Sequence, residues 1–245
     1  LCAFGDGLTD EIKRQSIEVD DERCDLLREV SARRRRSWLF ERWKTCLALI
    51  DDKEKLEEAF GLLAEYELSE DTAGTLTILL DQLASGYQEK HGNADVFTLA
   101  HYLFRTSGLS GCDQNEYYKP AASNLVSVIR RGRGLPISLA CIYLLVGKRL
   151  GLDIEGCNVP NHFLARAIAG DRLILVDCFN GGATLDVAQL IPKGYDAAEQ
   201  IAGIRRGASV ATILQRVLSN LSQAHSYEKN DSEATFFIEL RESTG

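Results

Sequence analysis

The 245-residue chain contains no methionine and only four prolines, and its cysteines follow no regular spacing. Seven cysteines, an odd number without a CxxC pair, are typical of reduced thiols and argue against a disulfide framework. The four histidines include no His-x-x-x-His pair, so the sequence predicts neither a metal site nor another cofactor. The missing methionine suggests a chain without its native start.

Long apolar runs and excess positive charge are also absent. The longest uncharged apolar run, Leu135 to Gly147, is too short to cross a bilayer, and the first residues lack the pattern of a signal peptide. A net charge of −8 and a pI near 5.1 argue against broad binding to nucleic acid or anionic membranes. We therefore expect a cytoplasmic protein whose partner is another protein or a small molecule.

Most of the chain has the apolar spacing of amphipathic helices. Helices are expected over residues 21–50 (as one long helix or two short ones), 52–68, 71–89, 94–105, 121–131 and 208–227. Arg33 to Arg36, with Trp38 and Trp43 nearby, could form a nucleic-acid patch, but a solvated basic face with the tryptophans in the core fits the acidic chain better. Thr184 is expected to cap a short helix that ends at Leu190.

The clearest pattern lies between residues 132 and 182. Pro136 follows a glycine-containing turn, and Lys148 and Arg149 come just before Gly151. Proline suits a first helical position and cations suit a last turn, so this spacing predicts an apolar helix of about 22 Å. After that helix the apolar period changes from helical to alternating, which predicts strands.

Two strands joined by a short loop form the predicted hairpin. They are expected over residues 161–168 and 172–178, with Ala169 and Gly170 as the loop. In that register Ile168 faces Asp171, and His162 faces Asp177 on one side of the sheet. A loop one residue longer would instead pair His162 with Cys178. A carboxylate beside an imidazole would fix its tautomer and raise its basicity.

A helix, a strand with histidine and a strand with aspartate together resemble the transglutaminase-like superfamily of papain-type folds. The resemblance is closer to its bacterial SirB-type branch, which is often followed by tetratricopeptide repeats. It covers roughly residues 95 to 225. The matching residues are Gly134–Leu139, Tyr143, Arg149–Gly151, Pro160–Leu164 and Asp177–Gly182, with Leu103, Phe104, 115–120 and Ser123 upstream. The chain departs from the branch at Ala122, Asn161 and Cys178.

The resemblance implies an α+β fold with a papain/transglutaminase-like core, in which a helix packs on a small antiparallel sheet. We expect an N-terminal helical region over residues 1–90, this core over 91–207, and a C-terminal helix within 208–245. The polar loop before the core helix could form one wall of a cleft. Candidate binding residues are Asn115, Tyr117, Ser123, Asn161 and Asn180.

The superfamily nucleophile is a cysteine at the helix N-terminus, in a G-x-C pattern that places Pro136 at its position. Ser138 and Cys141 project from other helix faces, Cys178 points away from Asp177, and Cys157 is the least excluded substitute. A His162–Asp177 dyad without a nucleophile can bind a ligand, activate a water or only satisfy buried polar groups.

The resemblance thus implies a transglutaminase-like protein that lacks the nucleophile and has a vestigial dyad, serving as a non-catalytic binding or regulatory module. The alternative is a cysteine-type hydrolase or amide transferase with a relocated nucleophile. A third possibility is a helical scaffold whose first 90 residues carry the function.

Overall fold

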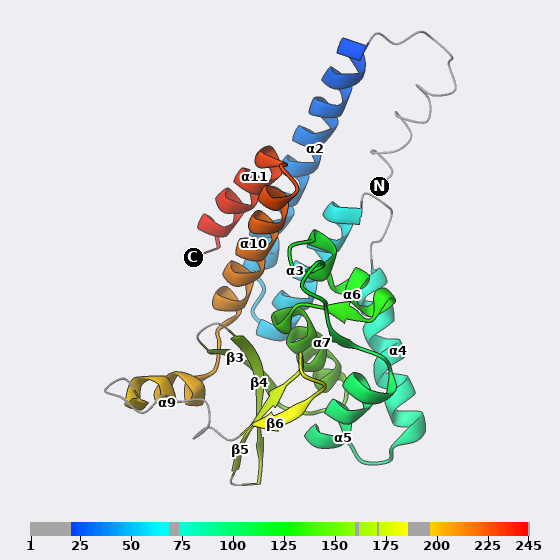
Figure 1. The fold of residues 1–245 in the computed structure, drawn as a ribbon, viewed down its shortest axis with the longest axis vertical. Helices are drawn as coiled ribbons and strands as arrows, with labels where there is room; N and C mark the ends of the chain where they lie inside the picture. Colours follow the sequence, from blue (N-terminus) through cyan, green and yellow to red (C-terminus); the bar gives the residue numbers. More distant parts are fainter. Residues whose placement is uncertain (1–20, 69–73, 160–161, 171, 186–196, 245) are drawn as a thin grey trace.

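The computed structural model describes residues 21–68, 74–159, 162–170, 172–185 and 197–244, and combines helices with a small sheet (Figure 1). The α-helices are α2 (Asp21–Leu47), α3 (Asp52–Leu68), α4 (Thr75–Lys90), α5 (Val96–His101), α6 (Leu125–Arg131), α7 (Pro136–Arg149), α9 (Ala197–Arg206), α10 (Val210–Tyr227) and α11 (Asp231–Glu242). The strands are β1 (Ser110–Gly111), β2 (Arg133–Gly134), β3 (Ile154–Val159), β4 (His162–Ala169), β5 (Arg172–Asp177) and β6 (Ala183–Leu185). The predicted α+β class is confirmed.

Helix α7 is the central element. It begins at Pro136, as predicted, and is buried from there to Gly147. One side packs on β3 and β4, and other sides contact α4, α5 and α6. Gly147 permits the close approach to β3, because a Cβ there would lie 2.7 Å from the Ile154 side chain. A helix buried on all sides explains why its sequence is apolar throughout.

The sheet has the order β3-β4-β5-β6, with all neighbours antiparallel. Ala169 faces Arg172 and Ile168 faces Leu173, so the predicted pairing of Ile168 with Asp171, and with it the direct pairing of His162 with Asp177, is wrong. Asp171 itself lies outside the described residues. The backbone conformation explains the shift. Gly170, the first residue of the observed loop, has a φ of +60°, which suits a tight turn. The predicted loop would have put Ala169 at this position instead. A two-residue shift leaves every side chain on its predicted face.

Three other predictions need correction. Thr184 does not cap a helix: it lies in β6 opposite Val176, and Leu190 falls outside the described residues. The helix expected over 121–131 is split into a 3₁₀ turn at Pro120–Ala122 and α6, because the Asn124 side chain caps α6 by accepting from Ser127 N–H. The helix expected over 94–105 consists of α5 followed by a short π-helix at Tyr102–Thr106.

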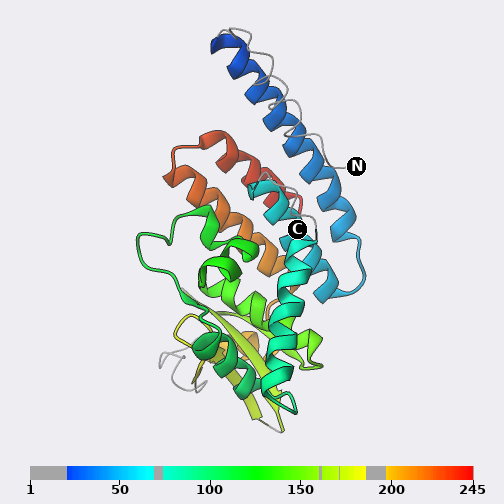
Figure 2. The same ribbon diagram turned by 90° about the vertical axis from the view of Figure 1, so that its right-hand side faces the viewer.

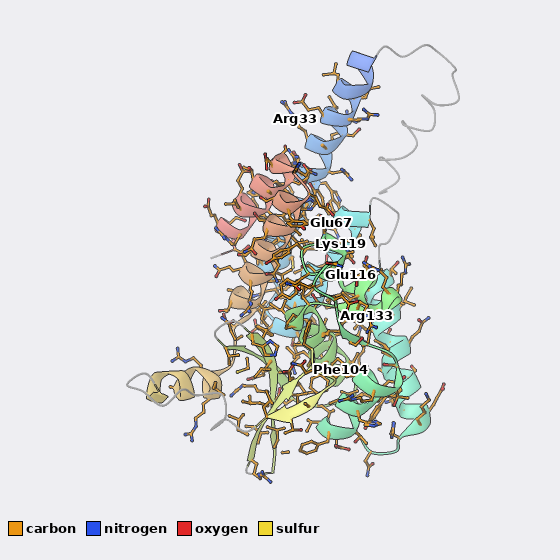
Figure 3. The ribbon with its side chains drawn as sticks, viewed as in Figure 1. Arg33, Glu67, Phe104, Glu116, Lys119 and Arg133 are labelled. Carbon is orange, nitrogen blue, oxygen red and sulfur yellow. The ribbon has the colours of Figure 1, made fainter. Side chains whose placement is uncertain are left out.

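The two ends of the described chain pack on each other. Helix α2 is one long helix, and α10 and α11 lie beside it (Figures 1 and 2). The Trp43 indole N–H donates to Thr244 Oγ1, and Arg36 pairs with Glu233 of α11. Arg33, labelled in Figure 3, is exposed and pairs with Glu29. The expectation of core tryptophans is confirmed for Trp43, and part of the arginine run contacts protein rather than solvent.

No helix in the described ranges is long and apolar enough to span a membrane. The predicted boundaries at residues 90 and 207 stay predictions. The helices predicted over 52–68 and 208–227 are confirmed as α3 and α10, while α9 and α11 were not predicted individually.

His225 of α10 is a buried titratable group in this helical packing. Its Nε2 lies 3.1 Å from Glu67 Oε1 of α3, and its ring stacks on Phe237 of α11. Burial lowers the pKa of His225, but the hydrogen bond that its imidazole donates to Glu67 and the charges of Glu67, Glu233 and Glu228 outweigh burial and raise the pKa above 6.5. The protonated imidazole therefore stabilises the packing of α10 on α3.

We expect a pH-dependent effect from His225→Gln. Because the folded pKa lies above the unfolded value, the stabilisation is complete below about pH 6.5 and is lost as the pH rises through the folded pKa. The variant should lose about 1 to 2 kcal/mol in mildly acidic buffer, and less at high pH. Urea unfolding from pH 5.5 to 8.5 measures both curves. A gap between them that does not shrink with rising pH would contradict the charged pair.

Candidate functional site

His162 and Asp177 form a hydrogen-bonded dyad at one end of the sheet. His162 begins β4 and Asp177 ends β5, so antiparallel pairing brings the two positions to the same end. His162 Nε2 lies 3.0 Å from Asp177 Oδ2. The imidazole side chain is 25% exposed, whereas the carboxylate is 7% exposed. The dyad therefore presents its histidine, and not its aspartate, to the surface.

The Asp177 carboxylate is held by four hydrogen bonds. Oδ1 accepts from the backbone N–H groups of Phe179 and Asn180, each at 3.1 Å. Oδ2 accepts from the Asn180 side-chain amide at 2.8 Å, in addition to its bond with His162. Burial raises the pKa of Asp177, but the hydrogen bonds from His162 and Asn180 outweigh burial, so the pKa lies below its ordinary value. The carboxylate is thus fixed and charged at neutral pH.

A charged carboxylate accepts hydrogen bonds, so neutral His162 donates its Nε2–H to Asp177 and leaves Nδ1 unprotonated. Among the described residues, no side chain is hydrogen-bonded to Nδ1. Nδ1 can therefore accept a hydrogen bond or a proton from a water or from a ligand. The Phe179 ring stands perpendicular to the imidazole, with 6.5 Å between ring centroids, and packs along one side of it.

The dyad lies on the sheet face that α7 does not cover. Phe163 and Val176 point toward the main core around α7. Leu164 and Leu175 point the other way, into a smaller cluster that includes Cys157 and Ile204 of α9. By strand alternation His162 and Asp177 share the face of this smaller cluster.

This helix, sheet and dyad lie within the part of the chain that matches a known family. The family model described as Transglutaminase-like superfamily matches residues 70–219, more than half of the chain. The chain belongs to the transglutaminase-like superfamily. Outside the match lie α2, α3 and α11.

Three similar proteins match segments of the chain that are shorter than the family match. A UPF0162 protein of Xylella fastidiosa is 40% identical over 131 residues, which are 51% of this chain and 46% of that protein. A UPF0162 protein of Pseudomonas aeruginosa is 30% identical over 126 residues, covering 51% and 47%. F-box only protein 21 of Mus musculus is 32% identical over 117 residues, covering 43% and 18%. The matched segment spans about half the length of the UPF0162 relatives. No solved structure matches the chain.

Of the predicted binding residues of the transglutaminase-like domain, the structure bonds one to the dyad and brings another near the His162 main chain. Asn180 is bonded to Asp177 directly. Tyr117 is 39% exposed and lies near Arg216, which donates to the His162 carbonyl. In the ranges that the structure describes, no hydrogen bond links Asn115 or Ser123 to the dyad, and Asn161 falls outside those ranges. Ser123 is buried, and no described residue is hydrogen-bonded to its hydroxyl.

The described thiols of the transglutaminase-like domain are buried and unpaired. They are Cys112, Cys141, Cys157 and Cys178, and Cys46 of α2 has the same environment. Burial raises the pKa of each of them, to about 11 for Cys157 and to about 12 for Cys46. Ser138 is also buried and donates to the Ala122 carbonyl at 2.9 Å. The expectation that Cys141 is a small buried apolar residue is confirmed, since it is 0% exposed.

Sequence reasoning missed Arg216 and Phe179 as neighbours of the dyad. Arg216 lies in α10, 54 residues beyond His162, and no local pattern reports such a contact. Phe179 belongs to the motif on which the family resemblance is based. Its position two residues after Asp177 could have indicated that it lies near the dyad.

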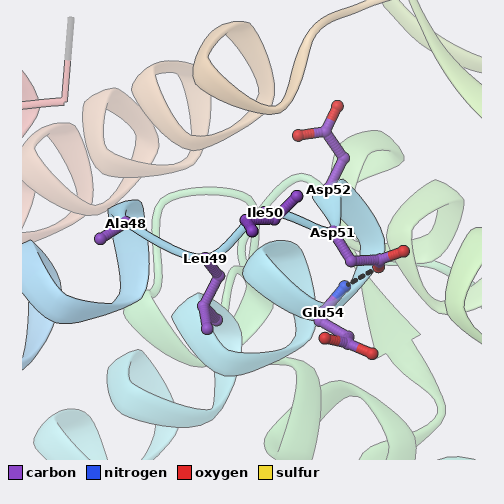
Figure 4. Close-up of a pocket in the computed structure, with 6 residues that line it drawn as sticks. All are labelled: Ala48, Leu49, Ile50, Asp51, Asp52 and Glu54. Carbon is purple, nitrogen blue, oxygen red and sulfur yellow. Dashed lines mark hydrogen bonds between the residues drawn. The ribbon is translucent and has the colours of Figure 1, made fainter.

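Two hollows on the surface lie away from the dyad. One is formed at the turn between α2 and α3 by Asp51, Asp52 and Glu54, with Ile50 98% exposed beside them (Figure 4). A second, of about 670 Å³, is lined by α3, α4 and the end of α7, including Glu57 and Arg149. Neither contains His162 or Asp177. No group of three potential metal ligands occurs in the described part of the chain.

Proposed function

We propose that this transglutaminase-like domain is a non-catalytic binding or regulatory module, in which His162 and Asp177 contact a ligand rather than activate a thiol. One observation carries the proposal: every cysteine whose side chain the structure describes is buried, with its pKa raised. Pro136 stands where the resemblance to the superfamily places the nucleophilic cysteine. It has no nucleophilic group of its own.

Thiol chemistry explains why burial counts against catalysis. The thiolate is the nucleophile, and a thiol with a pKa of about 11 is ionised to only about one part in 10⁴ at neutral pH. Cys157 is the thiol that shares the sheet face of the dyad, and it is 0% exposed between apolar neighbours. A relocated nucleophile at this position would meet neither water nor substrate.

The dyad keeps what a binding site needs. Asp177 is fixed by four hydrogen bonds and orients the imidazole, so Nδ1 of His162, to which no described side chain is bonded, has a defined direction. A preorganised acceptor of this kind suits an N–H or O–H donor on a ligand. The 18% coverage of F-box only protein 21 supports the modular part of the proposal, because the matched segment is a small part of that chain.

The unpaired thiols favour a reducing compartment, so we place the protein in the cytoplasm and expect a protein or small molecule as partner. We also propose that the protein belongs to the SirB-type branch of the superfamily. It is supported by the motif around Pro136 and by the Asp177–Gly182 segment.

We expect slow alkylation of all described thiols. Iodoacetamide at pH 7.5, followed by peptide-resolved mass spectrometry, should modify Cys46, Cys112, Cys141, Cys157 and Cys178 at least about 100-fold more slowly than in the urea-unfolded chain, because modification requires a rare opening of the fold. Peptide resolution separates these sites from Cys2 and Cys24.

His162→Gln is the matched control for this labelling. A nucleophile activated by the dyad would react fast in the native chain and slow down when the imidazole is replaced. Such a single, His162-dependent site would overturn the non-catalytic proposal and favour the hydrolase or amide transferase. Equal, slow rates in both chains support it.

A further inference from the structure

Arg216 of α10 is a half-buried cation, and none of the residues that the structure describes is its ionic partner. Its Nη1 donates to the His162 carbonyl at 3.1 Å and to the Asn158 side chain. Its guanidinium carbon lies 5.6 Å from the centre of the Phe163 ring. These contacts hold the group against β3 and the first residues of β4, and all of them are neutral. In the described part of the chain no carboxylate forms an ion pair with Arg216.

One edge of this guanidinium is unused. Its Nε and Nη2 groups donate to no acceptor among the described residues. This edge has the fork geometry that binds both oxygens of a carboxylate. Burial lowers the pKa of Arg216, and the nearby Tyr117 hydroxyl offsets only part of that effect. The acid next to Tyr117 in sequence, Glu116, is engaged with Arg131. Figure 3 labels Glu116 and Lys119 on this loop.

Three exposed tyrosines lie in a row that begins near Arg216. Tyr117 and Tyr118 have ring centroids 5.6 Å apart, and Tyr118 stacks on Tyr227 at 5.4 Å. Their exposed fractions are 39%, 44% and 70%. Arg216 and Tyr227 are separated by three turns of α10, so they lie roughly 20° apart around the helix and about 16 Å apart along it. The tyrosine-bearing loop therefore follows one face of α10.

We propose that Arg216 and the tyrosines Tyr117, Tyr118 and Tyr227 form a binding site for a carboxylate ligand that carries a flat apolar group. The unused edge of Arg216 takes the carboxylate, and the stacked rings take the apolar group. Tyrosine rings offer a large contact area with little loss of conformational freedom. The carboxylate would supply the counter-charge that Arg216 lacks.

A carboxylate fits this site better than a phosphate. Arg216 carries a single positive charge, which a monoanion balances, whereas a dianionic phosphate would leave one charge uncompensated in a half-buried place. The inference rests on the proposed function, because it specifies a ligand of the binding module. The bound anion would lie beside the His162 main chain, on the sheet face of Phe163, because Arg216 donates to the His162 carbonyl and lies over the Phe163 ring.

Titration with 3-phenylpropionate, a carboxylate on a phenyl group, tests the site. We expect saturable shifts of the Arg216 Nε–H signal and of the three tyrosine ring signals in NMR spectra of the full chain. The neutral isostere 3-phenylpropionamide should bind at least about ten-fold more weakly. Arg216→Gln should weaken 3-phenylpropionate binding about 10- to 100-fold, as expected for charge-assisted hydrogen bonds.

Tyr117→Ala tests the tyrosine rings independently. Its ring lies near Arg216, within reach of a phenyl group whose carboxylate is bound there, and we expect affinity to fall about 2- to 10-fold. Arg172→Gln, an exposed arginine at the start of β5, is the matched control and should bind like the parent chain. Melting curves check that Arg216→Gln is folded.

Equal binding of the acid and the amide, an unchanged Arg216→Gln chain, or no saturable shift would each overturn the carboxylate site. Shifts of the same signals by inorganic phosphate, with none by 3-phenylpropionate, would replace it by a phosphate site and so overturn it too. A fast, His162-dependent thiol would end the non-catalytic proposal but leave this site standing. Loss of this site would not affect the thiol result.

Discussion

Asp177→Ala is expected to lower the free energy of unfolding by about 2 to 4 kcal/mol, because it removes the only side-chain acceptor of four buried or half-buried donors. The donors are His162 Nε2, the Asn180 amide, and the backbone N–H groups of Phe179 and Asn180. None of them has another partner in the described structure that could replace the carboxylate. Urea unfolding followed by circular dichroism measures the loss.

The effect of Asp177→Ala should also depend on pH. The folded pKa of Asp177 lies below its unfolded value, so its stabilisation is present above about pH 4 and is lost as the pH falls through the folded pKa. The stability gap between the parent and the variant should therefore close in acid. A gap that persists at low pH would mean that lost packing, and not the charge, explains the effect.

Two controls separate the dyad from a general effect of removing an acid. Asp177→Asn keeps the shape and one acceptor oxygen, so it should cost less than the alanine variant. Asp153→Ala removes a carboxylate that is 88% exposed and pairs with Lys53, and it should cost under about 0.5 kcal/mol. An equal cost for Asp177 and Asp153 would contradict the network drawn around the dyad.

The sequence was informative where the decisive interactions are local. Pro136 and the cations near Gly151 fixed the bounds of α7, since helix ends are set by neighbouring residues. The dyad was predicted in spite of the wrong hairpin register. Side chains alternate with a period of two, so a two-residue shift kept His162 and Asp177 on one face.

Tertiary contacts decided what the sequence did not predict. Thr184 is a residue type that often caps helices, but the pairing of Thr184 with Val176 makes its segment a strand. Arg216 reaches the His162 carbonyl from a helix 54 residues away, and no spacing within α10 indicates it. Asp177 accepts hydrogen bonds from backbone N–H groups in the turn after β5. The residue pattern predicts this turn but not the direction in which its N–H groups point.

Trp43→Ala should have the largest effect on stability, with an expected loss of about 3 to 5 kcal/mol. The Trp43 side chain is 0% exposed, and its indole N–H donates to Thr244 Oγ1 at 3.0 Å. Removing it leaves a cavity between α2 and the C-terminal helices and takes away the donor to Thr244 Oγ1, although that hydroxyl still donates to the Leu240 carbonyl. Since whole domains are stable by about 5 to 15 kcal/mol, this loss would be a large part of the total.

Trp43→Phe separates the two parts of this loss. Phenylalanine keeps most of the buried area and loses the hydrogen bond, so it should cost about 1 to 2 kcal/mol. Trp38→Ala, which removes a half-buried ring of the same helix, is the control and should cost clearly less than Trp43→Ala. A loss below about 1 kcal/mol for Trp43→Ala would contradict the packing of α2 on the C-terminal helices.

The shape of the Trp43→Ala unfolding curve tests whether that packing belongs to the fold of the site. Trp43 and Leu39 of α2 belong to the same continuous core as Leu139 of α7 and Phe237 of α11, although α2 and α11 lie outside the family match. A continuous core predicts one cooperative transition, with the dyad and the terminal helices unfolding together. Far-UV circular dichroism and the His162 ring signal should then give the same midpoint. Separate midpoints would show that the terminal helices form a unit of their own, and that the dyad folds without them.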